Sequence, residues 1–275
     1  MMRKILHAIK YAVSFPLRVF RVTLRLKPID SKAPFSGPLS SEGIYGSSIS
    51  DASARELKKL FLTREKNSSF NVALNENQKS ALVEIFDKLE PIVRSYLGKE
   101  SYLDGINWMA TQPNEKSISG NWHTDNVGNR LKCFVCVEGD GQTPTLIIPS
   151  KDRNPKLTTV FRNTTIELLR WLGLKSEREI ENQFFASHKT GSLFLFDTQL
   201  FHRGGYSSGQ TERVIFHLEF SDRRKHKLIT GPIGTADYNS FCYDKGLSNV
   251  KSFANLLDKD RIVEFSEGVF AYQPK

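Results

Sequence analysis

The sequence predicts a mainly β protein with flanking helices, an α+β fold class, and three observations support it. Residues 102–220 form a series of short apolar segments separated by Gly and Pro, a pattern typical of a sandwich or barrel. Two amphipathic helical segments precede this series, and we find no internal repeat. The 275 residues, 39% hydrophobic and 25% charged, suffice for one large domain or two small ones with a buried core.

The two helical segments are identified by capping signals and by the spacing of apolar residues. Ser53-Ala-Arg-Glu56 matches a capping box and predicts a helix to about Leu62. A longer helix is predicted over residues 75–97, where Pro91 is expected to break or kink it. Its apolar residues at helical spacing are Leu82, Ile85, Phe86, Leu89 and Val93. We expect the two helices to cover one face of a sheet.

Six strands are predicted after residue 102, each short and bounded by turn residues. They lie at residues 106–111, 121–125, 131–137, 145–148, 192–197 and 213–220. A helical insertion is predicted at about residues 160–172, followed by a charged stretch. Residues 28–50 are rich in Ser, Gly and Pro and are expected to be a linker or irregular loop.

The positive charge of the chain is concentrated at its N-terminus. Residues 1–29 contain seven basic residues and no acidic one, so that of the formal net charge of +9 only +2 remains for the rest. We therefore expect no nucleic-acid partner. No apolar run here is long enough to span a bilayer. Residues 1–27 predict a basic amphipathic helix, which suits an anionic membrane surface or a transit peptide. Docking of this helix on its own domain is an equal alternative.

The chain has three cysteines, and a number that is both low and odd does not fit a disulfide framework. We therefore expect a reducing, cytoplasmic location, with peripheral membrane contact left open. Cys133 and Cys136 form a CxxC motif, but they lie in a predicted strand. Residues three apart on a strand point to opposite faces, so the two thiols are expected to be core residues and not metal ligands.

The first candidate metal ligands lie in the segment Asn121-Trp-His-Thr-Asp125. On a strand, His123 and Asp125 point to the same face, because they are two residues apart. An imidazole beside a carboxylate supplies two of the three ligands of a 2-His-1-carboxylate iron site. The third candidate ligand is His202, which follows an apolar strand and precedes Gly204 and Gly205. An ordinary hydrogen-bonded surface pair and a loop cap are the alternatives for these residues.

Arg213 begins the last predicted strand, eleven residues after His202. An arginine that points into an apolar sheet needs an anionic partner. The planar guanidinium matches a carboxylate with two parallel hydrogen bonds, and the distal carboxylate of 2-oxoglutarate would supply one. A surface ion pair with Glu212 or Asp197 is the alternative. His217 shares the face of Arg213 and is expected to be a core residue, and His188 is assigned no role.

The pattern His-x-Asp, a distant His and a later Arg resembles the Fe(II)/2-oxoglutarate-dependent dioxygenases, and within them the phytanoyl-CoA dioxygenase group. The stretches that look like signatures of that group are residues 122–125, 144–149 and 191–213. The resemblance covers about residues 100–222 and implies a double-stranded β-helix, a jelly-roll or cupin-like barrel. It also implies Fe(II) ligation by His123, Asp125 and His202, 2-oxoglutarate binding by Arg213, and O2 as co-substrate.

Composition and the resemblance together suggest how the chain is divided, and the resemblance suggests what it does. We expect a basic segment at 1–29, a linker with a short helix at 30–74, the dioxygenase domain at 75–222 and a C-terminal extension at 223–275. Halogenating relatives carry a small residue in place of the carboxylate, so Asp125 favours hydroxylation of a small-molecule or lipid-like substrate. The alternatives are a hydroxylase of protein side chains and a non-catalytic binding barrel recruited to membranes.

Overall fold

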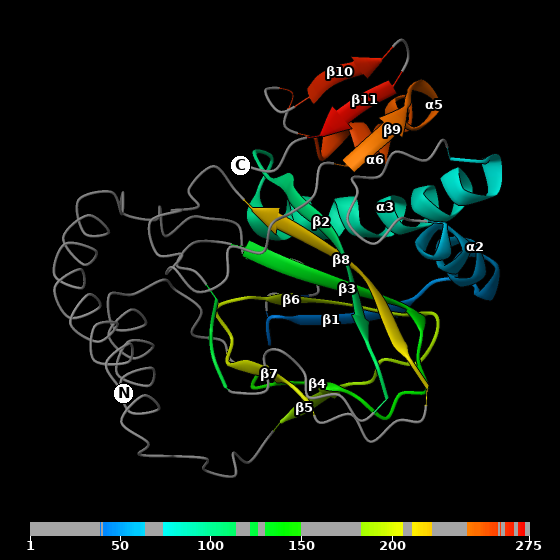
Figure 1. Ribbon diagram of the computed structural model, residues 1–275. Coiled ribbons are helices and arrows are strands. Elements are labelled where there is room, and N and C mark those ends of the chain that lie inside the picture. The colour runs from blue at the N-terminus through cyan, green and yellow to red at the C-terminus, as the bar shows by residue number, and fades with distance from the viewer. Residues whose placement is uncertain are drawn as a thin grey trace, which may run out of the picture.

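The computed structural model describes residues 39, 41–63, 74–113, 122–125, 130–149, 183–205, 211–221, 241–257, 259, 262–266 and 269–272. The described strands form three antiparallel sheets, and helices pack beside them (Figure 1). The predicted class, mainly β with flanking helices, is therefore confirmed. The described strands form separate sheets, so the closed double-stranded β-helix stays a prediction.

The main sheet contains five strands in the order β1-β6-β3-β8-β2. The bounds are Ile44–Ser48 for β1, Tyr102–Thr111 for β2, Arg130–Glu138 for β3, Ser192–Asp197 for β6 and Arg213–Ser221 for β8. Four of these strands lie close to their predicted positions. β1 was not predicted, because its sequence Ile-Tyr-Gly-Ser-Ser lies in a stretch rich in loop residues; pairing with β6 makes it the edge strand.

Two helices cover one face of the main sheet. α2 spans Asp51–Leu62 and is capped by Ser50, so the predicted capping box at Ser53 is wrong by three residues. α3 spans Glu76–Leu97 and begins with a capping box between Asn75 and Gln78. The helix continues through Pro91, so the expected break does not occur. The five apolar residues predicted for its buried face are all fully buried.

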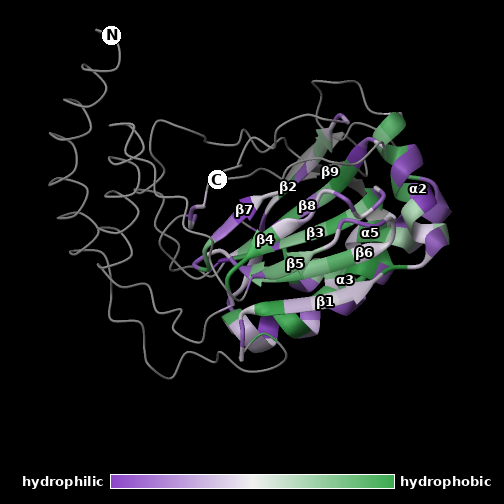
Figure 2. Cartoon of the chain, turned by 90° about the horizontal axis from the view of Figure 1, so that it is seen from below, coloured by the Kyte–Doolittle hydropathy of each residue, from purple (hydrophilic) through white to green (hydrophobic). Residues whose placement is uncertain are grey.

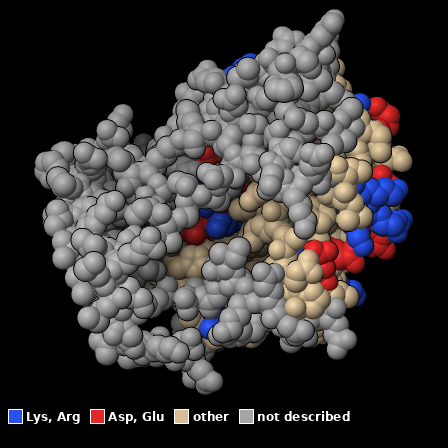
Figure 3. Space-filling view, in the orientation of Figure 1, with Lys and Arg blue, Asp and Glu red and all other residues tan. Residues whose placement is uncertain are grey.

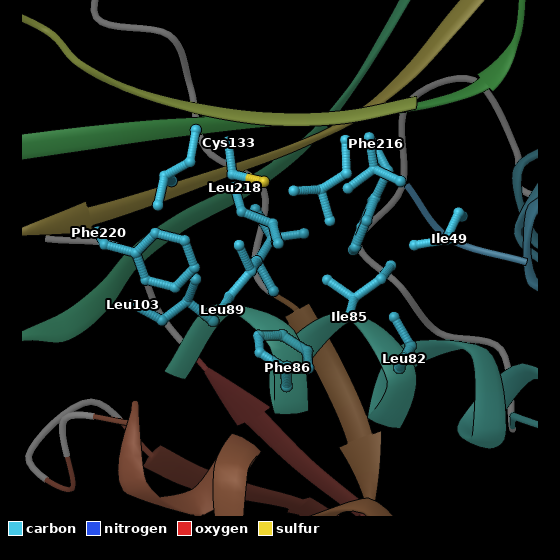
Figure 4. Packing of buried hydrophobic residues seen from close by; sticks show 14 of the residues in the cluster. Ile49, Leu82, Ile85, Phe86, Leu89, Leu103, Cys133, Phe216, Leu218 and Phe220 are labelled. Carbon is cyan, nitrogen blue, oxygen red and sulfur yellow. The ribbon is translucent and has the colours of Figure 1, made fainter. Parts of the chain in front are cut away.

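The core between α3 and the main sheet follows from the alternation of side chains along the strands. Leu218 and Phe220 of β8 and Cys133 of β3 point toward Phe86 and Leu89 of α3 (Figure 4). Each large apolar side chain buried in this way contributes about 1.5–3 kcal/mol. The alternate residues of β3 and β8 therefore face the other side of the sheet, away from the helices.

A smaller sheet lies across that other side, in the order β5-β4-β7. β4 spans Thr145–Ile147, β5 spans Phe184–Ala186 and β7 spans His202–Gly204. Below the main sheet in Figure 1, and in front of it in Figure 2, the small sheet faces the side opposite α3. The buried residues between the two sheets are Phe134, Ile147, Ala186, Phe194, Phe196, Leu200 and Ile215. We call this space the inter-sheet layer.

The C-terminal region forms a third sheet in the order β10-β11-β9. Its strands span Phe241–Asp244 (β9), Ile262–Ser266 (β10) and Val269–Tyr272 (β11), with α5 at Lys245–Ser248 and α6 at Lys251–Asn255. Phe253 of α6 packs edge-on against Phe86 of α3, with ring centroids 4.8 Å apart. The basic segment at 1–29 and the insertion at 160–172 lie outside the described residues. Within the described part, no helix has the length and apolar character to cross a membrane.

Glu84 of α3 joins the two helices and makes a testable contribution to stability. Its carboxylate accepts hydrogen bonds from the backbone N–H of Ser50 and from the side chains of Ser50, Ser53 and Lys88. Burial opposes ionisation, but these bonds outweigh it and lower the pKa of Glu84 to about 2. Because the folded pKa lies below the usual value, the stabilisation is present above about pH 4.5 and is lost as pH falls toward 2.

We therefore expect Glu84→Gln to lower the free energy of unfolding at pH 7 by about 1–3 kcal/mol, allowing for solvent screening. The difference from the wild type should shrink between pH 4.5 and pH 2. Urea unfolding at several pH values measures it. Glu76→Gln, a change at an exposed position of the same helix, is the control and should show little difference. A constant difference across the pH range would contradict this assignment.

Candidate metal centre

The two histidines of the predicted site are brought together by backbone pairing. His123 and His202 form an isolated antiparallel bridge, in which each backbone N–H donates to the carbonyl of the other at 3.0 and 2.9 Å. Directly opposed residues of an antiparallel pair project to the same face, and the two imidazole centroids lie 4.4 Å apart. The strand predicted at 121–125 is thus a single bridge within the described residues 122–125.

Asp125 is the third residue of the predicted site and lies two residues after His123 on the same extended segment. Its Oδ1 lies 3.7 Å from His123 Nε2, and its Oδ2 lies 3.7 Å from His202 Nε2. One ligand atom from each of the three residues lies within 4.8 Å of the others. Ligands about 2.1 Å from a metal in neighbouring positions are about 3 Å apart, so a small inward movement suffices for all three to share one ion.

A turn after β6 fixes the backbone around these ligands. Asp197 ends β6, and its Oδ1 accepts the N–H of Gln199, while the hydroxyl of Tyr96 on α3 donates to its Oδ2 at 2.6 Å. The carbonyl of Thr198 in this turn accepts the N–H of Asp125. The carbonyl of Leu200 lies 3.0 Å from His202 Nδ1. Helix α3 therefore supports the three candidate ligands through buried Tyr96, which bonds to the first residue of this turn.

The protonation states suit a metal. A carbonyl only accepts hydrogen bonds, so His202 Nδ1 carries the proton and its Nε2 lone pair faces Asp125. Burial is the main reason that the pKa of His202 falls to about 3, which leaves the imidazole neutral at pH 7. For Asp125, burial raises the pKa, but the positive charges of Lys132 and Arg130 outweigh it and hold the pKa well below the usual value. Neutral imidazoles and an ionised carboxylate are the forms that bind metals.

A buried charge network continues from Asp125 along the inner faces of β3 and β8. Lys132 Nζ lies 2.6 Å from Asp125 Oδ2 and 4.0 Å from Glu219 Oε1. Arg130 Nη2 lies 2.7 Å from Glu219 Oε1 and 3.4 Å from Asp125 Oδ2. His217 Nε2 lies 3.5 Å from Glu219 Oε1. In Figure 3, acidic and basic side chains appear together at the bottom of a recess in this face of the molecule.

Arg130, Lys132 and Glu219 are members of this network that were not predicted from the sequence. A signal was present, because Arg130 and Lys132 are two apart in one apolar strand, and His217 and Glu219 are two apart in another. Charged residues at period two in buried strands require partners. Which partners they have depends on the register, in which Lys132 lies opposite Glu219.

Arg213 lies at the start of β8, as predicted, and is buried. Its guanidinium donates to the carbonyl of Thr143 at 3.1 Å and to Thr111 Oγ1 at 2.9 Å. Its Nε has no hydrogen-bond partner, and among the described residues no carboxylate pairs with it. The alternative surface pairs are not formed: Glu212 bonds to Gln112, and Asp197 to Tyr96. A buried guanidinium bonded to neutral groups alone retains capacity for an anion.

Two other histidines lie in the inter-sheet layer. His217 is buried and packs edge-on against Phe134 at 5.0 Å. His188, to which no role was assigned, is also buried, and its Nε2 shares a hydrogen bond with Thr145 Oγ1 at 2.9 Å. Burial first, and then the charge of Arg213, lower the pKa of His188 well below its usual value. His188 is therefore a neutral polar group near Arg213.

The two cysteines of the CxxC motif are core residues, as predicted. Cys133 and Cys136 are both buried on β3, and Cys133 belongs to the core beneath α3. Burial raises the pKa of Cys136 to about 12 and that of Cys133 still higher. Since the thiolate is the reactive form, we expect neither thiol to react with a disulfide reagent in the folded protein, whereas both should react in urea. Mass mapping of labelled peptides measures this; rapid native labelling of either residue would contradict it.

The chain is similar in structure to several proteins of known structure. No family model and no curated protein matches the chain. The crystal structure of EvdMO1 is 13% identical, with a TM-score of 0.45, over 67% of this chain and 48% of that one. AviO1 from Streptomyces viridochromogenes Tue57 is 11% identical, with a TM-score of 0.49, over 73% of this chain and 98% of that one.

A third similar structure is HygX from Streptomyces hygroscopicus, described with nickel and 2-oxoglutarate bound. It is 11% identical, with a TM-score of 0.48, over 67% of this chain and 85% of that one. The present chain spans about half the length of EvdMO1, 48%. Because these TM-scores lie below 0.5, the function of this chain has to be inferred from its own residues.

Proposed function

We propose that this chain is an Fe(II)- and 2-oxoglutarate-dependent dioxygenase that hydroxylates a small-molecule or lipid-like substrate. The observation that carries the proposal is the convergence of His123, Asp125 and His202 at the edge of the inter-sheet layer. Two imidazoles and one carboxylate are the ligand set of non-haem Fe(II) oxygenases, which leave three coordination positions open. A donor set of this kind, with the His202 tautomer fixed by Leu200, fits Fe(II).

The chain would hold the metal with the three ligands and the co-substrate with Arg213. When bound, Fe(II) with 2-oxoglutarate and O2 supplies the oxidising power to hydroxylate a C–H bond, with succinate and CO2 as co-products. Arg213 would bind the distal carboxylate of 2-oxoglutarate, because its guanidinium is buried and, within the described part of the chain, bonds to Thr143 and Thr111 and to no carboxylate. The aromatic side chains of Phe134, Phe194 and Phe196 lie in the inter-sheet layer, where Phe196 packs against His202, and would exclude water from it.

Anaerobic titration of the purified chain with Fe(II) and then 2-oxoglutarate tests the proposal. A visible metal-to-ligand charge-transfer band is expected only when both are present, because it requires the 2-oxo acid to chelate the metal. Succinate release that increases with a substrate candidate then tests catalysis. Absence of the band with Fe(II) bound would contradict the proposal and favour a non-catalytic binding barrel. A screen of small molecules, lipids and peptides separates the proposed substrates from protein side chains.

Residues 1–27 lie outside the described part of the chain, and their contact with an anionic membrane surface stays a proposal. Flotation with vesicles containing anionic lipid, comparing the full chain with one lacking residues 1–27, tests it. Equal flotation of both would contradict the membrane role, and flotation of the full chain alone would support it.

A further inference from the structure

Two basic side chains of β3 contact the carboxylate of Asp125, and both contact the same oxygen. Lys132 Nζ lies 2.6 Å from Asp125 Oδ2, and Arg130 Nη2 lies 3.4 Å from that oxygen. The other oxygen, Oδ1, faces His123 Nε2 at 3.7 Å. Each oxygen therefore lies 3.7 Å from the Nε2 of one histidine, Oδ1 from that of His123 and Oδ2 from that of His202, but both basic side chains pair with Oδ2.

The contact between Lys132 and Asp125 is built into the sheet. Lys132 and Arg130 are two apart on β3, so both point from the inner face toward the ligands. Glu219 lies opposite Lys132 on β8, is 1% exposed and binds Arg130 at 2.7 Å. The side chain of Lys132 is 15% exposed, so water screens this charge-assisted hydrogen bond far less than at the surface.

We infer that Lys132 is a positioning residue of the metal centre, which holds Asp125 Oδ2 so that the carboxylate binds a metal through Oδ1 alone. This inference rests on the proposed function. A carboxylate can bind a cation through one oxygen or through both. Two-oxygen binding by Asp125 would fill one of the three positions that a chelating co-substrate and O2 require. Lys132 thus keeps the open face of the centre free, while Arg130, bound to Glu219, supports it.

The electrostatics predict an effect that differs from a loss of structure. Replacement of Lys132 by Met keeps most of the side-chain volume and leaves all three ligands in place. It also removes a positive charge close to the metal, and the loss of this repulsion favours binding of the metal cation. Metal binding should therefore persist, whereas the coordination geometry and the affinity for 2-oxoglutarate should change. A purely structural role for Lys132 would instead lower the stability and the metal affinity together.

Cobalt(II) is a suitable probe, because its visible spectrum reports the number and geometry of its ligands. We expect Lys132→Met to bind Co(II) within about tenfold of the wild type, but with a changed spectrum before 2-oxoglutarate is added. Its affinity for 2-oxoglutarate should fall by about 10- to 100-fold, a loss of the size that outer partners of metal ligands cause in metal affinity or activity. Lys132→Arg retains the donor and should keep the wild-type spectrum. Lys189→Met, at an exposed lysine of the described chain, is the matched control.

The outcomes separate this inference from the proposed function. If the wild type binds neither Co(II) nor Fe(II), the proposed function fails, and the inference fails with it. If the wild type binds the metal and Lys132→Met has an unchanged metal-only spectrum, the positioning role is wrong and the proposed function stands. Loss of Co(II) binding by Lys132→Met, with an unaltered thermal melting temperature, would also overturn a role confined to orienting Asp125. Thermal melting of Lys132→Met and Lys132→Arg without metal identifies any failure to fold. If only Lys132→Met fails to fold, the Co(II) spectrum of Lys132→Arg is the test, and a spectrum unlike that of the wild type would contradict the positioning role.

Discussion

A His202→Ala variant is expected to lose Fe(II) binding and, with it, the charge-transfer band and all substrate-dependent succinate release. Removal of an outer partner of a metal ligand already costs about 10- to 100-fold in affinity, so loss of a ligand should exceed about 100-fold. The neutral imidazole of His202 is oriented by Leu200 and is paired with His123 through the backbone. Apart from His123, which is itself a member of the set, no described histidine lies in it, so none is placed to substitute for His202.

The experiment needs a control for general unfolding, because His202 is buried and its ring centroid lies 4.9 Å from that of Phe196. His202→Gln keeps more of the side-chain volume and should show the same loss of Fe(II) affinity with a smaller loss of stability. His188→Gln, at a buried histidine outside the metal set, should retain Fe(II) binding. Isothermal titration with Fe(II) under anaerobic conditions measures all three. Wild-type affinity in His202→Ala would remove this histidine from the site.

The parts of this molecule that the sequence could predict are those that depend on local periodicity. The apolar face of α3 and the strands β3, β6 and β8 follow from spacing within a single segment. Arg213 and His202 could be identified because each adjoins a strongly apolar strand. His123 and Asp125 point the same way, since two residues of extended chain suffice for that even without a full strand.

Other features depend on contacts between distant segments and were not predictable. β1 forms because β6 offers an edge, and its own Gly and Ser residues favour no strand. Lys132 acquires its partners through the register of β3 with β8 and through a segment that carries Asp125. Tyr96 supports the candidate ligands only because α3 packs where β6 ends and the turn begins. Charge periodicity in β3 and β8 could reveal that partners exist, but not which residues they are.

The second large effect is expected at Arg213, where the change should fall on 2-oxoglutarate and not on the metal. Loss of one member of a buried, hydrogen-bonded charge pair costs about 2–5 kcal/mol, or roughly 30- to 4,000-fold in affinity. We expect Arg213→Met to weaken 2-oxoglutarate binding within this range while Fe(II) affinity stays near that of the wild type. Arg213→Lys should recover only part of the affinity, because a lysine lacks the planar pair of donors.

The decisive measurement compares two ligands within each variant, so that any loss of stability cancels. 2-Oxobutyrate has the chelating 2-oxo acid of 2-oxoglutarate but lacks the distal carboxylate. The wild type should therefore prefer 2-oxoglutarate strongly, and Arg213→Met should bind both ligands with similar affinity, as measured by anaerobic titration of the Fe(II) form. Arg55→Met, an exposed arginine of α2, should keep the wild-type preference. If Arg213→Met kept the preference for 2-oxoglutarate, the distal carboxylate would bind elsewhere in the protein. Arg213 would then have a structural role only, in which its hydrogen bonds to Thr143 and Thr111 join β8 to neighbouring segments.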